Sequence, residues 1–174
     1  VAVYDNRDNI INAYKGKLIE LSSYFYHHYI GASFNFVNLN AIHQQYWQVR
    51  KKHIIAIQSK LRFSFGDAPF LDMSTLGNDD ILRGYAKNRF RDRHFWGTQV
   101  EYRFPLFWRF GGVAFAGAGD VFKDRKDFGL SSVKYSVGGG IRFVINPAER
   151  LNLRLDYGYG REGGHFYFVV AESF

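Results

Sequence analysis

The chain has 174 residues, a net charge of +7, and 12 Tyr, 18 Phe and 3 Trp. This length normally forms one domain, and the absence of cysteine excludes a disulfide framework, a thiol nucleophile and a cysteine-ligated metal. The basic residues alternate along predicted strands or lie at turns, so nucleic acid is not an expected partner. No run of 18 apolar residues occurs, which excludes a transmembrane helix.

Apolar and polar residues alternate with the period of a β-strand through most of the chain. Residues 1–16 resemble the end of an earlier strand followed by a periplasmic turn, so we expect the chain to begin inside something larger. The pattern then predicts about eight strands, over residues 17–29, 32–48, 53–65, 96–104, 110–121, 132–145, 150–159 and 165–174. Most are close to the length that a tilted membrane strand requires.

One side of each predicted strand is charged and the other is apolar. In residues 99–104, Glu101 and Arg103 alternate with Tyr102 and Phe104. A cationic side chain facing lipid near mid-membrane costs about 2–4 kcal/mol, so the charged side is expected to face a lumen. The face that looks inward is inferred from the strand positions of five basic residues, Lys60, Arg62, Arg103, Arg142 and Arg154. The sequence therefore predicts an all-β fold, an antiparallel transmembrane β-barrel.

The connections between the predicted strands alternate in length. Short turns are expected at 49–52, 105–109 and 146–149, and longer links at 66–95, 122–131 and 160–164. Barrels of the outer membrane have short periplasmic turns and long extracellular loops, which places the C-terminus on the periplasmic side. The link 66–95 is too apolar for a solvated tail, and we expect it to fold into the lumen.

The segment Leu82-Arg-Gly-Tyr85 in this link resembles the Arg-Gly-Phe/Tyr motif of the BamA/TamA superfamily of outer-membrane barrels, also called the bacterial surface antigen family. The resemblance extends over about residues 1–174, in order and spacing. Its other elements are Gly66-Asp-Ala-Pro-Phe70, Leu76-Gly77, Glu101-Tyr-Arg-Phe-Pro105, Gly138-Gly-Gly-Ile-Arg142 and Leu153-Arg-Leu-Asp-Tyr-Gly158.

The resemblance implies a protein of the bacterial outer membrane that is not an enzyme and needs no cofactor. The family barrel has sixteen strands, and the eight predicted here match its C-terminal half. Either the chain is a fragment, or an eight-stranded unit closes alone or pairs with a copy. The implied role is insertion or translocation of proteins at the outer membrane. The alternative is a surface antigen barrel with a structural, anchoring or pore role, such as the membrane anchor of a larger secreted protein. Expected partners are outer-membrane lipid and lipopolysaccharide, together with client outer-membrane proteins or other barrel-assembly subunits.

Arg83 is the residue on which the implied function depends most, because a guanidinium inside a barrel needs a fixed anion. Glu101 is the first candidate partner, followed by Asp156 and Asp120. Many relatives carry an acid where this chain has Gly117. Gly84 would let the backbone turn tightly beside the barrel wall, and Tyr85 could stack on that wall. The alternative reading is a static clamp that stiffens the barrel.

The chain ends in a run of aromatic residues, of which Phe168 and Phe174 resemble the C-terminal signal that guides assembly of such barrels. Glu172 departs from that signal, because an aromatic residue is common there. The alternative is that Phe174 is only the last strand's final aromatic residue, in the interface belt.

Two chemical readings of the sequence are set aside. The six histidines are scattered, so no metal site is expected. Asp79 and Asp80 with His94 could suggest a protease, but polar residues are also what a loop apex requires.

Overall fold

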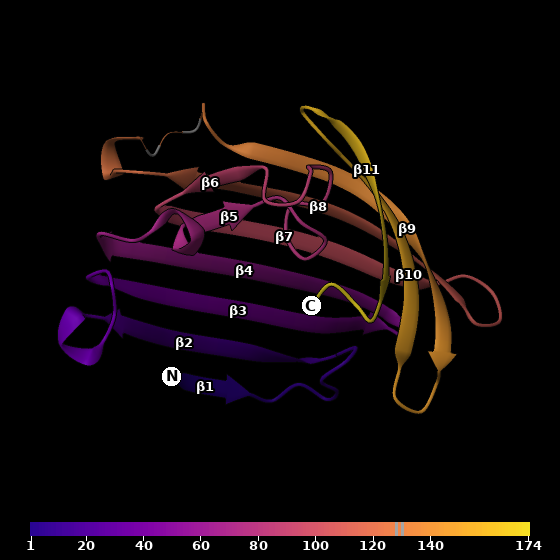
Figure 1. Cartoon of the computed structure of the whole chain (residues 1–174). Coiled ribbons are helices and arrows are strands. Elements are labelled where there is room, and N and C mark those ends of the chain that lie inside the picture. The colour runs from indigo at the N-terminus through magenta and orange to yellow at the C-terminus, as the bar shows by residue number, and fades with distance from the viewer. Residues whose placement is uncertain (128, 130) are drawn as a thin grey trace.

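The structure is a computed structural model, and it describes residues 1–127, 129 and 131–174. Nine strands form one antiparallel sheet in the order β1-β2-β3-β4-β7-β8-β9-β10-β11 (Figure 1). The strands of this sheet are β1 Ala2–Asp5, β2 Gly16–Tyr26, β3 Phe36–Arg50, β4 His53–Gly66, β7 His94–Pro105, β8 Phe110–Phe122, β9 Lys134–Asn146, β10 Leu151–Gly160 and β11 Gly163–Val170. The sheet curves like part of a barrel wall and is not closed, because among the described residues β1 and β11 each have one neighbouring strand.

The link between β4 and β7 folds against the concave side of the sheet (Figure 1). It contains a two-stranded sheet of β5 Ser74–Leu76 and β6 Phe90–Asp92. Three single-turn 3-10 helices, His28–Ile30, Phe70–Asp72 and Arg125–Asp127, lie in the connections. Among the described residues, no helix is long and apolar enough to cross a membrane.

The eight predicted strands are confirmed, with corrections at their ends. The strand predicted over 17–29 ends at Tyr26, and the strand predicted over 32–48 begins at Phe36. Residues 27–35 connect them. The strand predicted over 165–174 ends at Val170. Residues 1–16 contain β1 and a turn, as expected.

One predicted link is wrong. Residues 160–164 do not form a long loop, because Gly160 pairs with Gly163 across a two-residue turn. Gly163 has a φ of +124°, which a residue without a Cβ adopts easily. The link predicted over 122–131 begins after Phe122, and its residues 128 and 130 lie outside the described part of the chain.

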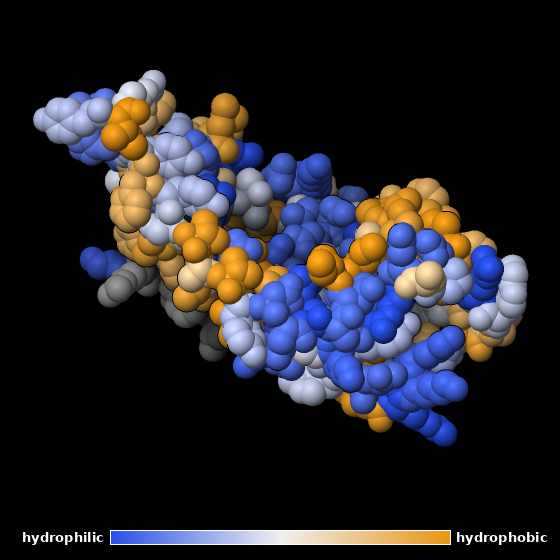
Figure 2. All heavy atoms as spheres, turned by 90° about the horizontal axis from the view of Figure 1, so that it is seen from below, coloured by the Kyte–Doolittle hydropathy of each residue, from blue (hydrophilic) through white to orange (hydrophobic). Residues whose placement is uncertain are grey.

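The two faces of the sheet have the predicted chemistry. Polar side chains are buried on the concave face, among them Gln44, Gln58, Gln99, Glu101, Arg103, Arg142, Arg154 and Asp156. Apolar side chains are exposed on the convex face, among them Leu39, Leu61, Val100, Tyr102, Ile141, Leu155 and Phe166. Seen from below in Figure 2, hydrophilic residues gather in the hollowed centre of the molecule and hydrophobic residues lie on either side. This arrangement is inverted relative to a soluble core and suits a wall between lipid and a polar lumen.

The N-terminal turn contacts the turn between β9 and β10. Arg150 Nη1 donates to Asp8 Oδ2 at 2.7 Å and lies over the Tyr14 ring, with Cζ 4.1 Å from the ring centroid. The other oxygen of Asp8 accepts from the backbone N–H groups of Tyr14 and Lys15. Burial alone would raise the pKa of Asp8, but the hydrogen bonds from Arg150, Tyr14 and Lys15 outweigh it and lower the pKa below its ordinary value.

We expect this contact to make stability depend on pH. A carboxyl whose folded pKa is depressed stabilises the fold above its unfolded pKa, and that stabilisation disappears as the pH falls through the folded value. The melting temperature of the protein should therefore fall between about pH 5 and pH 3 by more than that of Asp8→Asn. Equal pH profiles for the two proteins would contradict a role for the Asp8 charge.

Candidate functional site

The inward loop turns sharply at the motif Leu82-Arg83-Gly84-Tyr85. Asn78 Oδ1 accepts from the backbone N–H groups of Asp80 and Ile81 and starts the turn. Leu82 and Gly84 have φ values of +59° and +118°. The second value lies in a region where a side chain would be strained, which explains the glycine. An apolar cluster holds the loop to the wall: Leu76, Ile81, Leu82 and Tyr85 of the loop pack together with Phe95 of β7.

The turn aims Arg83 at the wall of the sheet, where it is fully buried. Its guanidinium pairs with two carboxylates, Asp156 on β10 at 2.6 Å and Glu101 on β7. Its Cζ lies 3.5 Å from the centroid of the Phe115 ring on β8, a cation–π contact. Arg83 therefore joins three strands of the wall, and both acids are fully buried with it.

The two acids also pair with cations of the wall. Arg103 Nη2 lies 2.8 Å from a second oxygen of Glu101, and Arg142 pairs with Asp156. Glu172, from the tail after β11, accepts from Arg142 Nε at 2.9 Å and is fully buried. We call this buried set the lumen ion network; its members are Arg83, Glu101, Arg103, Arg142, Asp156 and Glu172.

Asp120, the third acid named from the sequence, is not a partner of Arg83. It pairs with Lys134 and accepts from the Ser132 hydroxyl. On β8 the residue that contacts Arg83 is Phe115. Asp120 follows it by five residues, which corresponds to roughly 16 Å along a β-strand. Asp120 therefore joins β8 to β9 next to the loop that connects these two strands, and it does not contact the motif.

Glycines on strand β10 allow the loop to approach the backbone of the wall closely. A Cβ added to Gly158 would lie 2.6 Å from the carbonyl carbon of Arg83, and one added to Gly160 would lie 2.6 Å from the Tyr85 ring. A Cβ on Gly84 would in turn lie 2.9 Å from the backbone of Tyr159 and Gly160. We call Gly158 and Gly160 on β10 the glycine cradle. Backbone meets backbone there, which explains why strand β10 carries glycine at these inward positions.

The motif is also hydrogen-bonded to the edge strand β11. Tyr167 Oη accepts from the backbone N–H of Gly84 at 2.9 Å and donates to the carbonyl of Tyr85 at 2.8 Å. His165 Nδ1 lies 3.3 Å from the carbonyl oxygen of Gly84. Sequence reasoning missed Tyr167, although its alternation with Phe166 and Phe168 places it on the inward face.

Removing the Tyr167 hydroxyl is expected to release the motif from β11. Tyr167→Phe keeps the ring and deletes both hydrogen bonds, and each is worth about 0.5–1.5 kcal/mol. Amide hydrogen exchange should become faster at Gly84. Tyr157→Phe is the matched control, because that residue is on β10 and faces outward. Unchanged exchange at Gly84 in Tyr167→Phe would contradict the bridging role.

The two predicted C-terminal residues have different surroundings. Phe168 faces outward on β11 and is 69% exposed. Phe174 does not end the last strand, so its reading as that strand's final aromatic is wrong. Ala171, at a φ of +91°, turns the chain away from β11, and Phe174 packs beside Ala13 and Tyr46. The assembly signal itself stays a prediction.

Asp79, Asp80 and His94, which were considered for catalysis, each contact other parts of the chain. Asp79 and Asp80 pair with Arg154 and Lys60 and so attach the loop to the wall. His94 accepts from the backbone N–H of Ser64, and its ring makes tilted contacts with the rings of Phe63, Phe65 and Phe122. Within the part of the chain that the structure describes, no group of three His, Cys, Asp or Glu residues could hold a metal ion.

Comparisons with known proteins agree with the fold. Curated proteins give no match. Among solved structures, the chain is similar to the crystal structure of BamA from Haemophilus ducreyi lacking POTRA domains 1-3, with a TM-score of 0.79 and 14% identity. The similarity covers 97% of this chain and 41% of that one, so the chain spans less than half of the BamA chain. The family model of the Omp85 superfamily domain matches residues 1–174, and the protein therefore belongs to the Omp85 superfamily of outer-membrane barrel proteins.

Proposed function

We propose that this barrel assists the insertion or translocation of other proteins at the outer membrane, with its C-terminus on the periplasmic side. The observation that carries the proposal is the attachment of the loop motif to the edge strand β11 through Tyr167 and His165. An edge strand offers unpaired backbone groups on which a client strand can form. A loop bonded to that strand can control how firmly the strand is held.

The short pairing between β11 and β10 supports the same proposal. It pairs with β10 over eight residue pairs, whereas β3 and β4 form fourteen. Fewer ladder hydrogen bonds make a strand easier to displace from a sheet. The lumen ion network holds the other side of the motif to β7 and β10. The motif therefore joins a firmly paired part of the wall to a weakly paired edge.

The proposal is tested with the full protein in liposomes. A urea-unfolded eight-stranded outer-membrane barrel serves as the client, and its folding is followed by heat-modifiable gel migration. The protein should accelerate client folding over empty liposomes, and Tyr167→Phe should change that rate while its own barrel stays heat-modifiable. A client rate equal to that in empty liposomes would overturn the proposal.

A structural or anchoring role is the second candidate. The burial of Arg83, Leu82 and Tyr85 at 0–1% exposure favours it, because such a packed loop also suits a stiff plug. Planar-bilayer recordings distinguish a plug from a pore. A plugged anchor conducts little, and conductance should rise in Arg83→Ala if the loop closes the lumen. High conductance in the unmodified protein would reject the plug.

A further inference from the structure

Two short turns lie side by side at one end of the sheet. The turn between β3 and β4 contains the basic run Arg50-Lys51-Lys52, and the turn between β7 and β8 contains Trp108 and Arg109. The turns are adjacent because β4 pairs with β7, and Lys52, Trp108 and Arg109 line the same hollow, of about 100 Å³. One water molecule needs roughly 10–15 Å³, so the hollow has room for a phosphate group. We call the hollow and these five residues the turn surface.

The cations of the turn surface are not neutralised by the rest of the sheet. Among the residues that the structure describes, none pairs with or accepts a hydrogen bond from the side chains of Arg50, Lys51, Lys52 or Arg109. The lumen ion network, which reaches the inner end of the hollow, contains three arginines and three carboxylates and is balanced. The next short turn carries one exposed acid, Glu149. Positive charge is therefore in excess across these turns.

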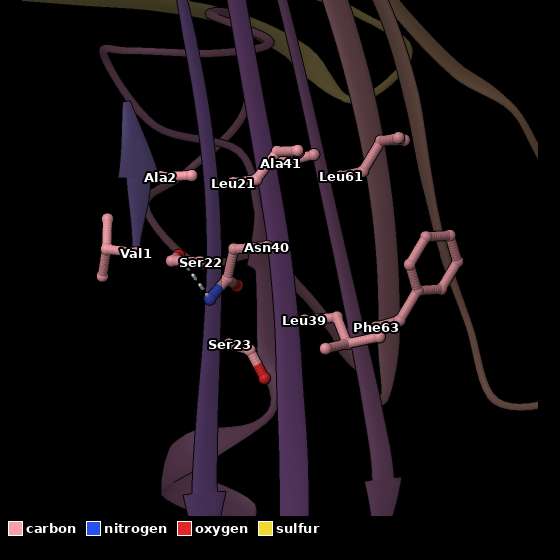
Figure 3. A pocket seen from close by; sticks show the side chains of 10 residues that line it. All are labelled: Val1, Ala2, Leu21, Ser22, Ser23, Leu39, Asn40, Ala41, Leu61 and Phe63. Atoms are coloured by element: carbon pink, nitrogen blue, oxygen red, sulfur yellow. Dashed lines mark hydrogen bonds between the residues drawn. The ribbon is translucent and has the colours of Figure 1, made fainter. Parts of the chain in front are cut away.

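The outward face of the same strands changes its chemistry toward the turns. Figure 3 shows Leu39, Leu61 and Phe63 around small uncharged side chains, in a part of β3 and β4 farther from the turns. Nearer the turns, Trp47 on β3 and Tyr102 on β7 lie opposite the same residue of β4. Trp and Tyr are enriched where the hydrocarbon of a membrane meets the lipid headgroups. This aromatic level therefore indicates the edge of the hydrocarbon, with the turns beyond it.

The length of β3 gives the same position for the basic turn. The strand has 15 residues, so its last residue, Arg50, is seven residues from its centre, roughly 23 Å along the strand. At a tilt of about 40° this is roughly 18 Å along the membrane normal, whereas the apolar band of such a barrel extends roughly 12 Å to either side of its centre. A strand centred in the membrane therefore brings this turn to the level of the headgroups.

The backbone of both turns presents bulky side chains at unusual positions. Lys52 and Trp108 have φ values of +60° and +49°, a region in which residues other than glycine are uncommon and asparagine, aspartate and histidine are the usual exceptions. Trp108 is 78% exposed, so its burial does not explain the choice. Its ring lies 5.6 Å from Arg109 Cζ and 6.0 Å from the ring of Phe143. Phe143 has the outward parity of Ile141 on β9, so Trp108 joins the lipid-facing wall to the cations.

We propose that the turn surface binds the headgroup of an anionic phospholipid in the periplasmic leaflet. This inference rests on the proposed periplasmic position of the short turns and not on the insertion role. Lys52 and Arg109 donate to the phosphate oxygens, as ammonium and guanidinium groups both can. The amphipathic ring of Trp108 packs against the glycerol and the first acyl carbons. The aromatic residues continue from the wall into the turn, which favours a ligand of the membrane over one of the periplasmic solution.

The test measures lipid contact through the fluorescence of Trp108 in the full protein. Trp47→Phe and Trp96→Phe leave it as the single tryptophan of the chain. Vesicles of phosphatidylcholine with a minority of phosphatidylglycerol are prepared in two forms, with the acyl chains of one lipid or of the other brominated, because bromine quenches tryptophan on contact. Brominated phosphatidylglycerol should quench Trp108 more than its share of the membrane predicts.

Removal of the two cations that line the hollow should abolish this preference. Lys52→Asn suits the positive φ, and it is combined with Arg109→Gln. Each basic residue near an anionic membrane surface is worth about fivefold in binding, so the preference should fall by about that factor for each charge. Lys87→Gln with Lys123→Gln is the matched control, because it removes two exposed charges from the long loops. The control should keep the preference, and heat-modifiable gel migration verifies that each variant folds.

Equal quenching by the two brominated lipids would overturn the proposal and leave an acidic periplasmic protein as the occupant of the turn surface. An equal loss of preference in the control variant would overturn it as well. If the first variant fails to fold, Arg50→Gln with Lys51→Gln decides, and an unchanged preference there rejects the proposal. No client protein is present in these vesicles. Failure of the lipid preference therefore leaves the insertion role untouched, and failure to accelerate client folding leaves the lipid preference untouched.

Discussion

Replacing Arg83 by alanine is expected to lower the free energy of unfolding by about 3–5 kcal/mol, the usual cost of breaking a buried ion pair. The guanidinium is fully buried, pairs with two buried carboxylates and lies 3.5 Å from the Phe115 ring. Its removal leaves Glu101 and Asp156 with fewer partners and no access to water. Reversible denaturant unfolding in detergent micelles, followed by tryptophan fluorescence, measures the loss.

A double-mutant cycle separates the pair from the rest of the network. Arg83→Ala and Glu101→Ala together should cost less than the sum of the single losses, by about 0.5–3 kcal/mol, because residues in direct contact are not independent. Arg89→Ala is the control. Arg89 pairs with Glu162 at 2.8 Å but both side chains are about half exposed, so its loss should be about 0–1 kcal/mol. Additive losses for Arg83 and Glu101 would reject the pairing.

The sheet could be predicted from the sequence because one physical constraint applies along every strand. Lipid on one side and a polar lumen on the other impose a period of two on residues such as Tyr102 and Arg103. The same constraint assigned Arg83 to Glu101 and Asp156, since both acids have inward parity. Asp120 failed because on β8 it has the parity of Ala114 and Ala118, which face outward, whereas Phe115, with the opposite parity, contacts Arg83.

The end of the chain was predicted wrongly, although the sequence carries a signal for it. Continuing β11 past Val170 gives Glu172 the same outward parity as Phe166 and Phe168, and a carboxylate there would face hydrocarbon. That cost favours a strand that ends earlier. The structure instead turns the chain at Ala171 and buries Glu172 beside Arg142. Its partners Asn152, Arg142 and Arg103 lie 20 residues away or more in the sequence, so local patterns could not have identified them.

The glycine cradle should also be sensitive to substitution, in this case to an added methyl group. In Gly158→Ala the new Cβ would lie 2.6–2.7 Å from the carbonyl group of Arg83 and the amide nitrogen of Gly84. These are backbone atoms, so no change of rotamer relieves the clash. Forcing extra volume into such a contact costs about 1–3 kcal/mol. The motif must move away from β10, which also draws Arg83 from Asp156.

Limited trypsin digestion detects this displacement directly. Lys87 and Arg89 follow the motif and are exposed, but cleavage requires the chain around them to unfold locally. Gly158→Ala should therefore be cut there faster than the unmodified protein. Gly139→Ala places the same methyl group on the outward face of β9, where the nearest atom is the Val113 carbonyl oxygen at 3.2 Å, and it should be cut at nearly the original rate. Of the two substituted glycines, Gly158 contacts the motif and Gly139 does not. Equal cleavage of the two variants would therefore mean that the motif does not rest on the cradle.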